Sequence, residues 1–338
     1  MLYSMLTSAV RLAPLALLAL GQIAHAEVDQ IRMSRGLSLG FLPSIIMEDQ
    51  KLVQKHASEA GLGEVDVQWN SFIGGAAMNE QLLAGQVDFA GGGPPPFMVL
   101  WARTKDTPLA VKAVAALNSS PMFLLTRKEN VNSIADFGPD DRIAVPGLKI
   151  SNQAVVLQMA SEKAFGDPSR LDPLTVQLGL PDAYAMLKSG TEITAAFSGP
   201  PFQYLSEDHK ASGIRAILNS EEVLGGPTTF LMMWTTQRFA AENPKAVHAV
   251  YNAIAEAIHV IDSDKQKAAE IFLRVTNERT PQEEIVRILE DPTTRFGLAP
   301  NNIMQYADFL SKNGVIKERP ESWKDLFLPG PVHELEGS

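Results

Sequence analysis

Short apolar runs alternate with segments of helical periodicity in the first part of the chain. Apolar runs predict strands at residues 37–41, 65–69 and 87–90, and the spacing of apolar residues predicts helices at residues 44–60 and 76–84. Alternating strands and helices are typical of parallel sheets. The pattern therefore predicts an α/β fold.

The same alternation starts again near the middle of the chain. Strands are predicted at residues 142–145, 174–177 and 193–197, and helices at residues 151–165 and 182–188. Because the pattern is written twice, and because 338 residues are enough for two domains, we expect two lobes.

The two blocks share a detail at the end of their last strand. Residues 82–85 (LLAG) lead into a strand that is followed by Gly93-Pro94, and residues 187–190 (LKSG) lead into a strand that is followed by Gly199-Pro200. Ligands of open parallel sheets bind beyond the carboxyl ends of the strands. Each Gly-Pro segment taken singly favours a simple reversal of the chain, but the duplication favours two turns that face a shared cleft.

The last third of the chain is mostly helical. A long apolar stripe follows Asn243-Pro244, residues 280–283 (TPQE) have the pattern of a capping box, and another helix is predicted near residues 301–312. We expect these helices to pack on one lobe, and residues 329–338 to form a loose tail.

The first 26 residues have the pattern of a secretory signal peptide. They contain one base, Arg11, and no acid, and an apolar run at residues 12–20 is too short to cross a bilayer. The run is followed by Ala24-His25-Ala26, a small-x-small site that predicts cleavage before Glu27. We therefore expect an exported protein that is soluble in a periplasm after removal of this segment.

Composition and charge exclude several classes of protein. The chain has 29 basic and 39 acidic side chains, a net charge of -10, and no basic block, which argues against a nucleic-acid partner. It has no cysteine, which excludes thiolate metal sites, a cysteine nucleophile and a lipid-modified cysteine. Neither a phosphate-binding loop nor a catalytic or metal-ligand motif is present. We expect no catalytic residues, no metal and no cofactor.

The remaining candidates are suited to holding a small polar ligand. Glycine and capping residues at predicted helix starts leave backbone amides free, and a helix N-terminus carries about half a positive charge, which favours a carboxylate or a sulfonate. Aromatic residues near strand ends are candidate pocket walls, and two threonines lie where the chain would return to the first lobe. The candidates are Pro43, Ser44, Gly74, Gly75, Ala76, Gly93, Pro94, Ser151, Asn152, Gly199, Pro200, the aromatic residues Phe41, Trp69, Phe72 and Phe197, and the hinge residues Thr228 and Thr229.

Several segments, in order, resemble the periplasmic solute-binding proteins of ABC importers in the nitrate, sulfonate and taurine family. The matching segments are Gly74-Gly75, residues 82–90 (LLAGQVDFA), residues 131–137 (VNSIADF), residues 147–151 (GLKIS) and residues 239–244 (FAAENP). The resemblance spans about residues 37–310. It implies a type II fold of two lobes joined by two crossing segments, with the ligand held between the lobes.

The resemblance also implies the domain limits. We expect lobe 1 at residues 27–120, a hinge strand and lobe 2 at residues 121–228, and a return segment with C-terminal helices on lobe 1 at residues 229–328. The partners implied are a small-molecule ligand and a membrane permease, and the chain is expected to be a monomer that closes by hinge motion.

The ligand expected from the residues is a small organic anion, a sulfonate or a carboxylate, with an aromatic or hydrophobic body. The family also includes pyrimidine-precursor binders and a related enzyme of thiamine biosynthesis that depends on a cysteine-rich motif, which is absent here. The alternative interpretation is a pyrimidine-precursor binding protein or an enzyme in the same fold. A sensory module that presents its bound ligand to a receptor is a third possibility that sequence does not separate from transport.

Overall fold

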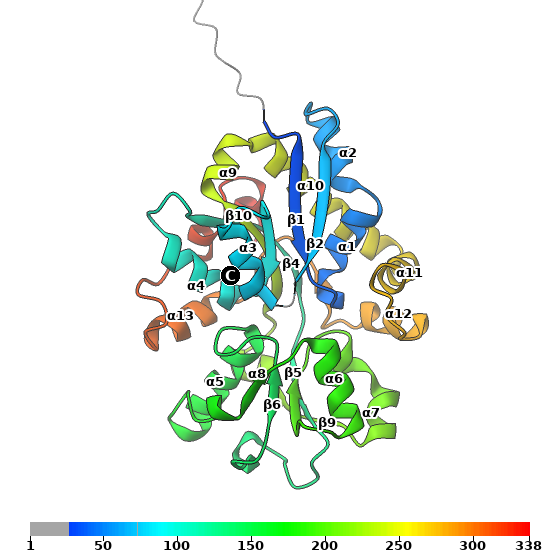
Figure 1. Cartoon of the computed structure of the whole chain (residues 1–338), viewed down its shortest axis with the longest axis vertical. Helices are drawn as coiled ribbons and strands as arrows, with labels where there is room; N and C mark the ends of the chain where they lie inside the picture. The colour runs from blue at the N-terminus through cyan, green and yellow to red at the C-terminus, as the bar shows by residue number, and fades with distance from the viewer. Residues whose placement is uncertain (1–26, 73) are drawn as a thin grey trace, which may run out of the picture.

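The computed structural model describes residues 27–72 and 74–338, and it has two lobes (Figure 1). In this part of the chain the strands form two sheets, one in each lobe. The predicted two-lobed α/β fold with C-terminal helices on the first lobe is confirmed. The predicted signal peptide lies outside the described residues.

Lobe 1 is built on a sheet with the strand order β11-β4-β10-β3-β1-β2. Its strands are β1 (Gln30–Arg35), β2 (Asp66–Ser71), β3 (Phe89–Gly92), β4 (Val111–Ser119), β10 (Thr229–Thr236) and β11 (Arg295–Phe296). Its helices are α1 (Leu42–Asp49), α2 (Leu52–Glu59), α3 (Gly74–Leu83), α4 (Pro94–Thr104), α9 (Gln237–Glu242), α10 (Pro244–Ser263), α11 (Lys265–Thr276), α12 (Gln282–Glu290) and α13 (Met304–Lys312).

Lobe 2 is built on a sheet with the strand order β7-β6-β8-β5-β9. Its strands are β5 (Phe123–Thr126), β6 (Ile143–Val145), β7 (Thr175–Gln177), β8 (Ala195–Phe197) and β9 (Arg215–Asn219). Its helices are α5 (Asn152–Phe165), α6 (Leu180–Ser189), α7 (Ser206–Ser212) and α8 (Ser220–Leu224).

The two sheets share one topology. In lobe 1, β2, β1 and β3 are parallel and β10 runs antiparallel between β3 and β4. In lobe 2, β7, β6 and β8 are parallel and β5 runs antiparallel between β8 and β9. The repeat in the sequence therefore corresponds to a repeated arrangement of strands, in which β6 takes the place of β1. The chain crosses between the lobes after β4 and again before β10 (Figure 1).

The structure corrects the first predicted elements. The apolar run at residues 37–41 is not a strand: β1 ends earlier, and Leu39–Phe41 forms a 3-10 helix that is apolar because all three residues are buried. The single helix predicted at residues 44–60 is two helices, α1 and α2, because Lys51 between them takes a left-handed conformation with a φ of 54°. The run of prolines after Gly93 does not form a turn but begins α4, since proline is tolerated in the first turn of a helix.

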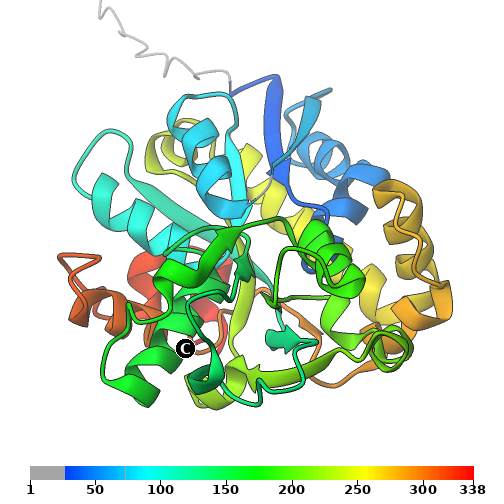
Figure 2. The same cartoon turned by 60° about the horizontal axis from the view of Figure 1, so that its bottom comes forward.

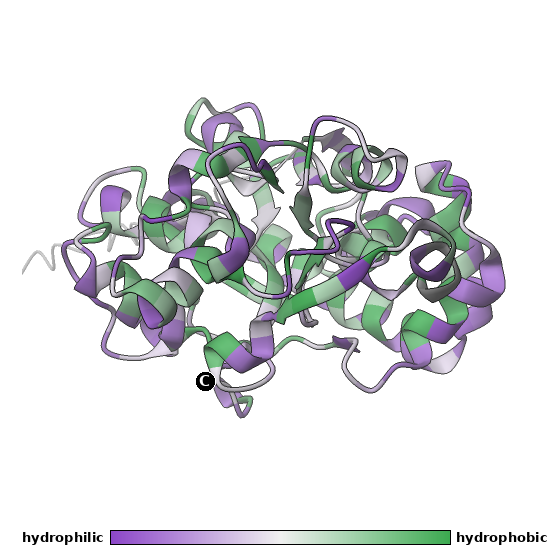
Figure 3. Cartoon of the chain, turned by 90° about the horizontal axis from the view of Figure 1, so that it is seen from below, coloured by the Kyte–Doolittle hydropathy of each residue, from purple (hydrophilic) through white to green (hydrophobic). Residues whose placement is uncertain are grey.

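The C-terminal helices cover lobe 1. α10 packs against α1 and α2, and α11 packs against α1, so that the yellow and gold helices lie beside the blue ones (Figure 2). On the other side of the lobe, α13 contacts α4. Seen from the lobe 2 end, the outer helices carry bands of both colours in the hydropathy view, as expected for helices with one buried face (Figure 3).

Two details of the C-terminal part differ from prediction. The capping box at residues 280–283 does not form, because α12 begins at Gln282 with Pro281 as its N-cap and the Thr280 hydroxyl bonds Glu278 instead. Residues 329–338 are not a loose tail. Val332 is 2% exposed, and the amide of Ser338 donates to the carbonyl of Pro300. Within the described residues, no helix is both long and apolar enough to cross a membrane.

Candidate functional site

A cavity of about 440 Å³ lies between the lobes. Both lobes contribute to its lining, lobe 1 in part through its strand β10, so the cavity depends on the two-lobed arrangement and not on either lobe alone. The lining residues are Gly36, Leu37, Ser38, Phe41, Ser71, Phe72, Gly74, Gly75, Gly92, Gly93, Pro96, Pro146, Ser151, Asn152, Gln153, Gly179, Leu180, Pro181, Asp182, Phe230 and Leu231.

Helices from both lobes begin at this cavity. α3 begins at Gly74, α5 is capped by Ser151, and α6 is capped by Gly179, and each of these residues lines the cavity. The first amides of an α-helix have no partner inside the helix, and they carry the positive end of the helix dipole. α4 also begins here, but its first three residues are prolines without an N–H. The helix ends that supply free amides are therefore those of α3, α5 and α6.

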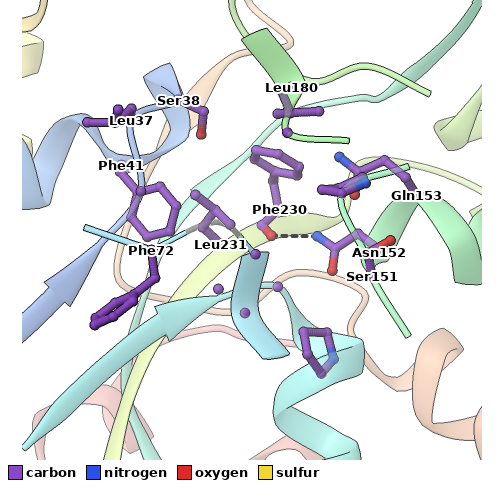
Figure 4. A pocket seen from close by; sticks show the side chains of 18 of the residues that line it. Leu37, Ser38, Phe41, Phe72, Ser151, Asn152, Gln153, Leu180, Phe230 and Leu231 are labelled. Atoms are coloured by element: carbon purple, nitrogen blue, oxygen red, sulfur yellow. Dashed lines mark hydrogen bonds between the residues drawn. The ribbon is translucent and has the colours of Figure 1, made fainter. Parts of the chain in front are cut away.

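The start of α5 is fixed by its cap. The Ser151 hydroxyl accepts from the amide of Ala154 at 3.2 Å and lies 2.6 Å from the carbonyl oxygen of Gly147, to which it donates. The predicted capping role of Ser151 is thus confirmed. Asn152 follows as the first helical residue, is 4% exposed, and donates through Nδ2 to the carbonyl of Phe230 in β10 at 2.7 Å (Figure 4).

The walls of the cavity are mainly apolar. Figure 4 shows Leu37, Phe41 and Phe72 on the lobe 1 side, Leu180 on the lobe 2 side, and Phe230 and Leu231 between them. The Phe41 ring lies against two glycines, because a Cβ atom on Gly36 would come within 2.6 Å of it and one on Gly91 within 2.9 Å. This close packing holds the ring in place and makes Phe41 a rigid wall.

Charge is scarce in the cavity. Among the lining residues that the structure describes, Asp182 in the first turn of α6 is the one charged side chain, and it is exposed. Arg35 bonds the carbonyl of Gly36 and the hydroxyl of Ser71, which both line the cavity, but its guanidinium is held by Glu48 at 2.6 Å. An anion in this cavity would therefore be held by backbone amides and helix ends and not by a free cationic side chain.

The structure brings seven of the predicted site residues together at the cavity: Phe41, Phe72, Gly74, Gly75, Gly93, Ser151 and Asn152. The remaining candidates do not line it. Trp69 lies on β2 two residues before its end, whereas the cavity lining starts at that end, with Ser71 and Phe72.

The other candidates outside the cavity belong to packed interior or to neighbouring loops. Pro43 and Ser44 are buried in α1, Ala76 and Pro94 lie in the first turns of α3 and α4, and Phe197 is 1% exposed in the core of lobe 2. Gly199 lies against the side chains of Phe230 and Leu180, and Pro200 follows it. Thr228 and Thr229 bond Asn302 and Asn301 of the C-terminal segment.

Sequence reasoning missed the part of the lobe 2 wall at the start of α6, and it missed the strand β10. Phe230 and Leu231 lie in an apolar strand with no feature that separates pocket residues from core residues. Gly179, Leu180 and Asp182 could have been predicted from the sequence. Glycine, proline and an acid at residues 179–182 are typical of a helix start, and this helix follows β7 as α5 follows β6. In the described part of the chain, no cluster of three or more histidine, aspartate or glutamate side chains could hold a metal ion.

Solved structures with the same fold include periplasmic binding proteins. The alkanesulfonate-binding protein SsuA from Xanthomonas axonopodis pv. citri, bound to MOPS, has a TM-score of 0.68 at 19% identity, over 87% of this chain and 96% of that chain. The aliphatic sulphonate binding protein SsuA from Escherichia coli has a TM-score of 0.64 at 18% identity, over 89% and 99%. The nitrate-binding protein NrtA from Synechocystis PCC 6803 has a TM-score of 0.64 at 15% identity, over 89% and 85%.

These similarities confirm the predicted type II periplasmic-binding-protein fold and the resemblance to solute-binding proteins of ABC importers. The three named neighbours are binding proteins. No curated protein sequence matches the chain. A family model does match it: the model of the NMT1-like family aligns with residues 24–275, well over half of the chain, and the protein therefore belongs to the NMT1-like family.

Proposed function

We propose that this protein is the extracytoplasmic solute-binding component of an ABC importer, and that it captures a small organic anion with an apolar body. One observation carries the proposal: free helix N-termini from both lobes meet at a cavity whose other walls are apolar. The helix ends suit the charged group of a sulfonate or carboxylate, and the apolar walls suit the rest of the ligand.

The size and lining of the cavity favour an organic anion over a small inorganic one. A cavity of about 440 Å³ is in the range of small-molecule sites. Nitrate would leave the rings of Phe41, Phe72 and Phe230 without a partner, and its hydration would be lost without a cationic side chain to replace it. One structural neighbour binds MOPS, a sulfonate with a saturated ring, and this supports an organic anion as the ligand.

The proposal extends to location and partners. A leader of 26 residues would direct the chain to the periplasm, where it would act as a monomer and deliver its ligand to a membrane permease. Differential affinity of the ligand for the closed arrangement of the lobes would supply the free energy of closure.

A melting-temperature screen of the purified mature protein tests the ligand class. Alkanesulfonates, aromatic carboxylates, nitrate and pyrimidines are added one at a time, with MOPS among the sulfonates. A ligand at 100 times its dissociation constant stabilises the folded state by about 2.7 kcal/mol, which raises the midpoint by several degrees. We expect the largest shift from an organic anion. A shift given only by cations, or by pyrimidines without an anionic group, would refute the proposal.

A further inference from the structure

One contact across the cleft joins Gly93 of lobe 1 to Asn152 of lobe 2. A Cβ atom placed on Gly93 would lie 1.7 Å from Oδ1 of Asn152, 2.3 Å from its Cγ and 2.4 Å from its Nδ2. The whole amide group of Asn152 therefore occupies the space above Gly93. The start of α5 is seated against the start of α4, and these helices belong to different lobes.

The backbone of Gly93 does not itself require glycine. Its φ of -82° and ψ of 164° are an extended conformation that any residue adopts. The lack of a side chain at this position is needed because of its neighbour in the other lobe. Glycine is therefore needed at position 93 because it allows the Asn152 side chain of lobe 2 to approach the lobe 1 backbone closely.

The Asn152 amide cannot turn aside freely. Its Nδ2 donates to the carbonyl of Phe230 at 2.7 Å, and Phe230 belongs to β10 at its entry into the lobe 1 sheet. This bond also fixes which end of the amide faces Phe230, since two oxygens at that distance would repel each other. The seat on Gly93 and the bond to Phe230 both disappear if lobe 2 swings away from lobe 1.

The oxygen of the Asn152 amide, in contrast, disfavours the closed arrangement. Oδ1 of Asn152 is buried and has no hydrogen-bond partner among the described residues. A buried acceptor without a partner is costly, and opening of the cleft would return it to water. At this contact, the closed arrangement is thus held by one bond and a fitted contact and is opposed by one unsatisfied oxygen.

We propose that Gly93 and Asn152 form an interlobe latch that sets the balance between the closed and open arrangements before any ligand binds. Only the closed arrangement joins the helix ends of α3, α5 and α6 in one cavity. The latch therefore sets the fraction of molecules that is ready to bind, and the apparent dissociation constant changes in inverse proportion to that fraction. This inference concerns closure and does not depend on the class of ligand.

The test is a double-mutant cycle measured by small-angle X-ray scattering on the ligand-free mature protein. In Gly93→Ala the new methyl carbon would lie 1.7 Å from Oδ1 of Asn152, and the two atoms must separate to at least 3.0 Å. We therefore expect the lobes to move apart and the radius of gyration to rise. In Asn152→Ala the amide atoms that the methyl group would meet are gone. We therefore expect Gly93→Ala to leave the radius of gyration unchanged in that background.

A matched control comes from a second glycine near the cleft. A Cβ atom on Gly147 would meet the Cβ atom of Ser151 at 3.6 Å, an ordinary contact, so Gly147→Ala is expected to scatter like the unmodified protein. Asn152→Asp provides a second probe if Gly93→Ala does not fold. It puts a carboxylate oxygen against the Phe230 carbonyl and is expected to open the lobes without any change in lobe 1.

Two results would overturn the latch. The first is a radius of gyration that stays the same in Gly93→Ala or in Asn152→Asp, which would mean that the side chain moves aside or that the lobes are already apart. The second is an equal expansion by Gly93→Ala with and without Asn152. Since no ligand is present, neither result bears on the melting-temperature screen, and a failed screen would leave the scattering result in place.

Discussion

The substitution Ser151→Asp tests whether the ligand's negative charge lies at the start of α5. Aspartate is as good an N-cap as serine, and a negative charge at a helix N-terminus stabilises the helix. The folded state should therefore be retained, with a melting temperature close to that of the unmodified protein. The new carboxylate, however, occupies the same positive field that would attract an anionic ligand.

The magnitude follows from the geometry of the cap. The Ser151 hydroxyl accepts from the amide of Ala154, so an aspartate in this position would hold its charge beside the free amides of Asn152 and Gln153. A charge about 5 Å from the ligand anion, at an effective dielectric constant of about 20, gives a repulsion of about 3 kcal/mol, or roughly a hundredfold in affinity.

Isothermal titration calorimetry with the organic anion that gives the largest melting shift measures this loss. Ser151→Asn is the matched control, because asparagine has the shape of aspartate and caps a helix without a charge. We expect the asparagine variant to bind within a few-fold of the unmodified protein. Equal affinity in the aspartate and asparagine variants would refute the placement of the anion at α5.

Three further predictions concern other parts of the structure. Asp182→Asn removes the one charge of the described cavity lining and should raise the affinity for an organic anion several-fold, with the gain reduced at high salt; a loss of affinity would indicate that Asp182 pairs with a cationic group on the ligand. Phe41→Ala should weaken binding of a sulfonate with a large apolar body by about 1–3 kcal/mol but leave methanesulfonate unaffected, as calorimetry with both would show. Burial raises the pKa of Asp141, but hydrogen bonds from Lys128 and the Gly138 amide outweigh it and leave the pKa below its ordinary value of 3.8. The stabilisation from the Asp141 carboxylate should therefore be present above its unfolded pKa and be lost as the pH falls through the lower folded pKa. Urea unfolding of Asp141→Asn should accordingly show a smaller loss of stability between pH 5 and pH 2 than that of the unmodified protein, by about 1.4 kcal/mol for each unit by which folding lowers the pKa.

The sequence was informative where a local rule decides the structure. Ser151 caps α5 as its position before a helical stripe predicts, and Gly190 ends α6 in a left-handed conformation with a φ of 74°. The stripe of α10 is buried at Val250, Ile254 and Ile261. In these cases the hydrogen bond, the dihedral angle or the buried face depends on residues that are close in the chain.

It was less informative where one pattern fits two structures. The apolar run at Leu39–Phe41 marks burial, and burial alone does not distinguish a short strand from a 3-10 helix. The three prolines that begin at Pro94 have the composition of a turn, but the first turn of a helix accepts them because its amides have no partner there. In both cases the residue types fit either structure, so composition alone did not decide between them.

The cavity itself was predicted only in part, for a topological reason. Phe41, Gly74 and Ser151 lie at element ends, which a sequence pattern marks. Phe230 reaches the cavity because β10 is inserted between β3 and β4 after the chain has returned from lobe 2. No local pattern encodes the insertion of a strand from so far along the chain, so the wall that lies between the lobes was missed.

The acidic net charge and the proposed anionic ligand are compatible because they act over different distances. A net charge of -10 gives a repulsive field at long range, which salt screens beyond about 8 Å at physiological ionic strength. Inside the cavity the amides at the starts of α3, α5 and α6 act over a few ångströms and are shielded from water by apolar walls. Long-range electrostatic steering can therefore contribute little to capture of the proposed anion, and its affinity must come from closure of the lobes around it. This makes the seat of Asn152 on Gly93, beside the same helix start, a natural point of control over affinity.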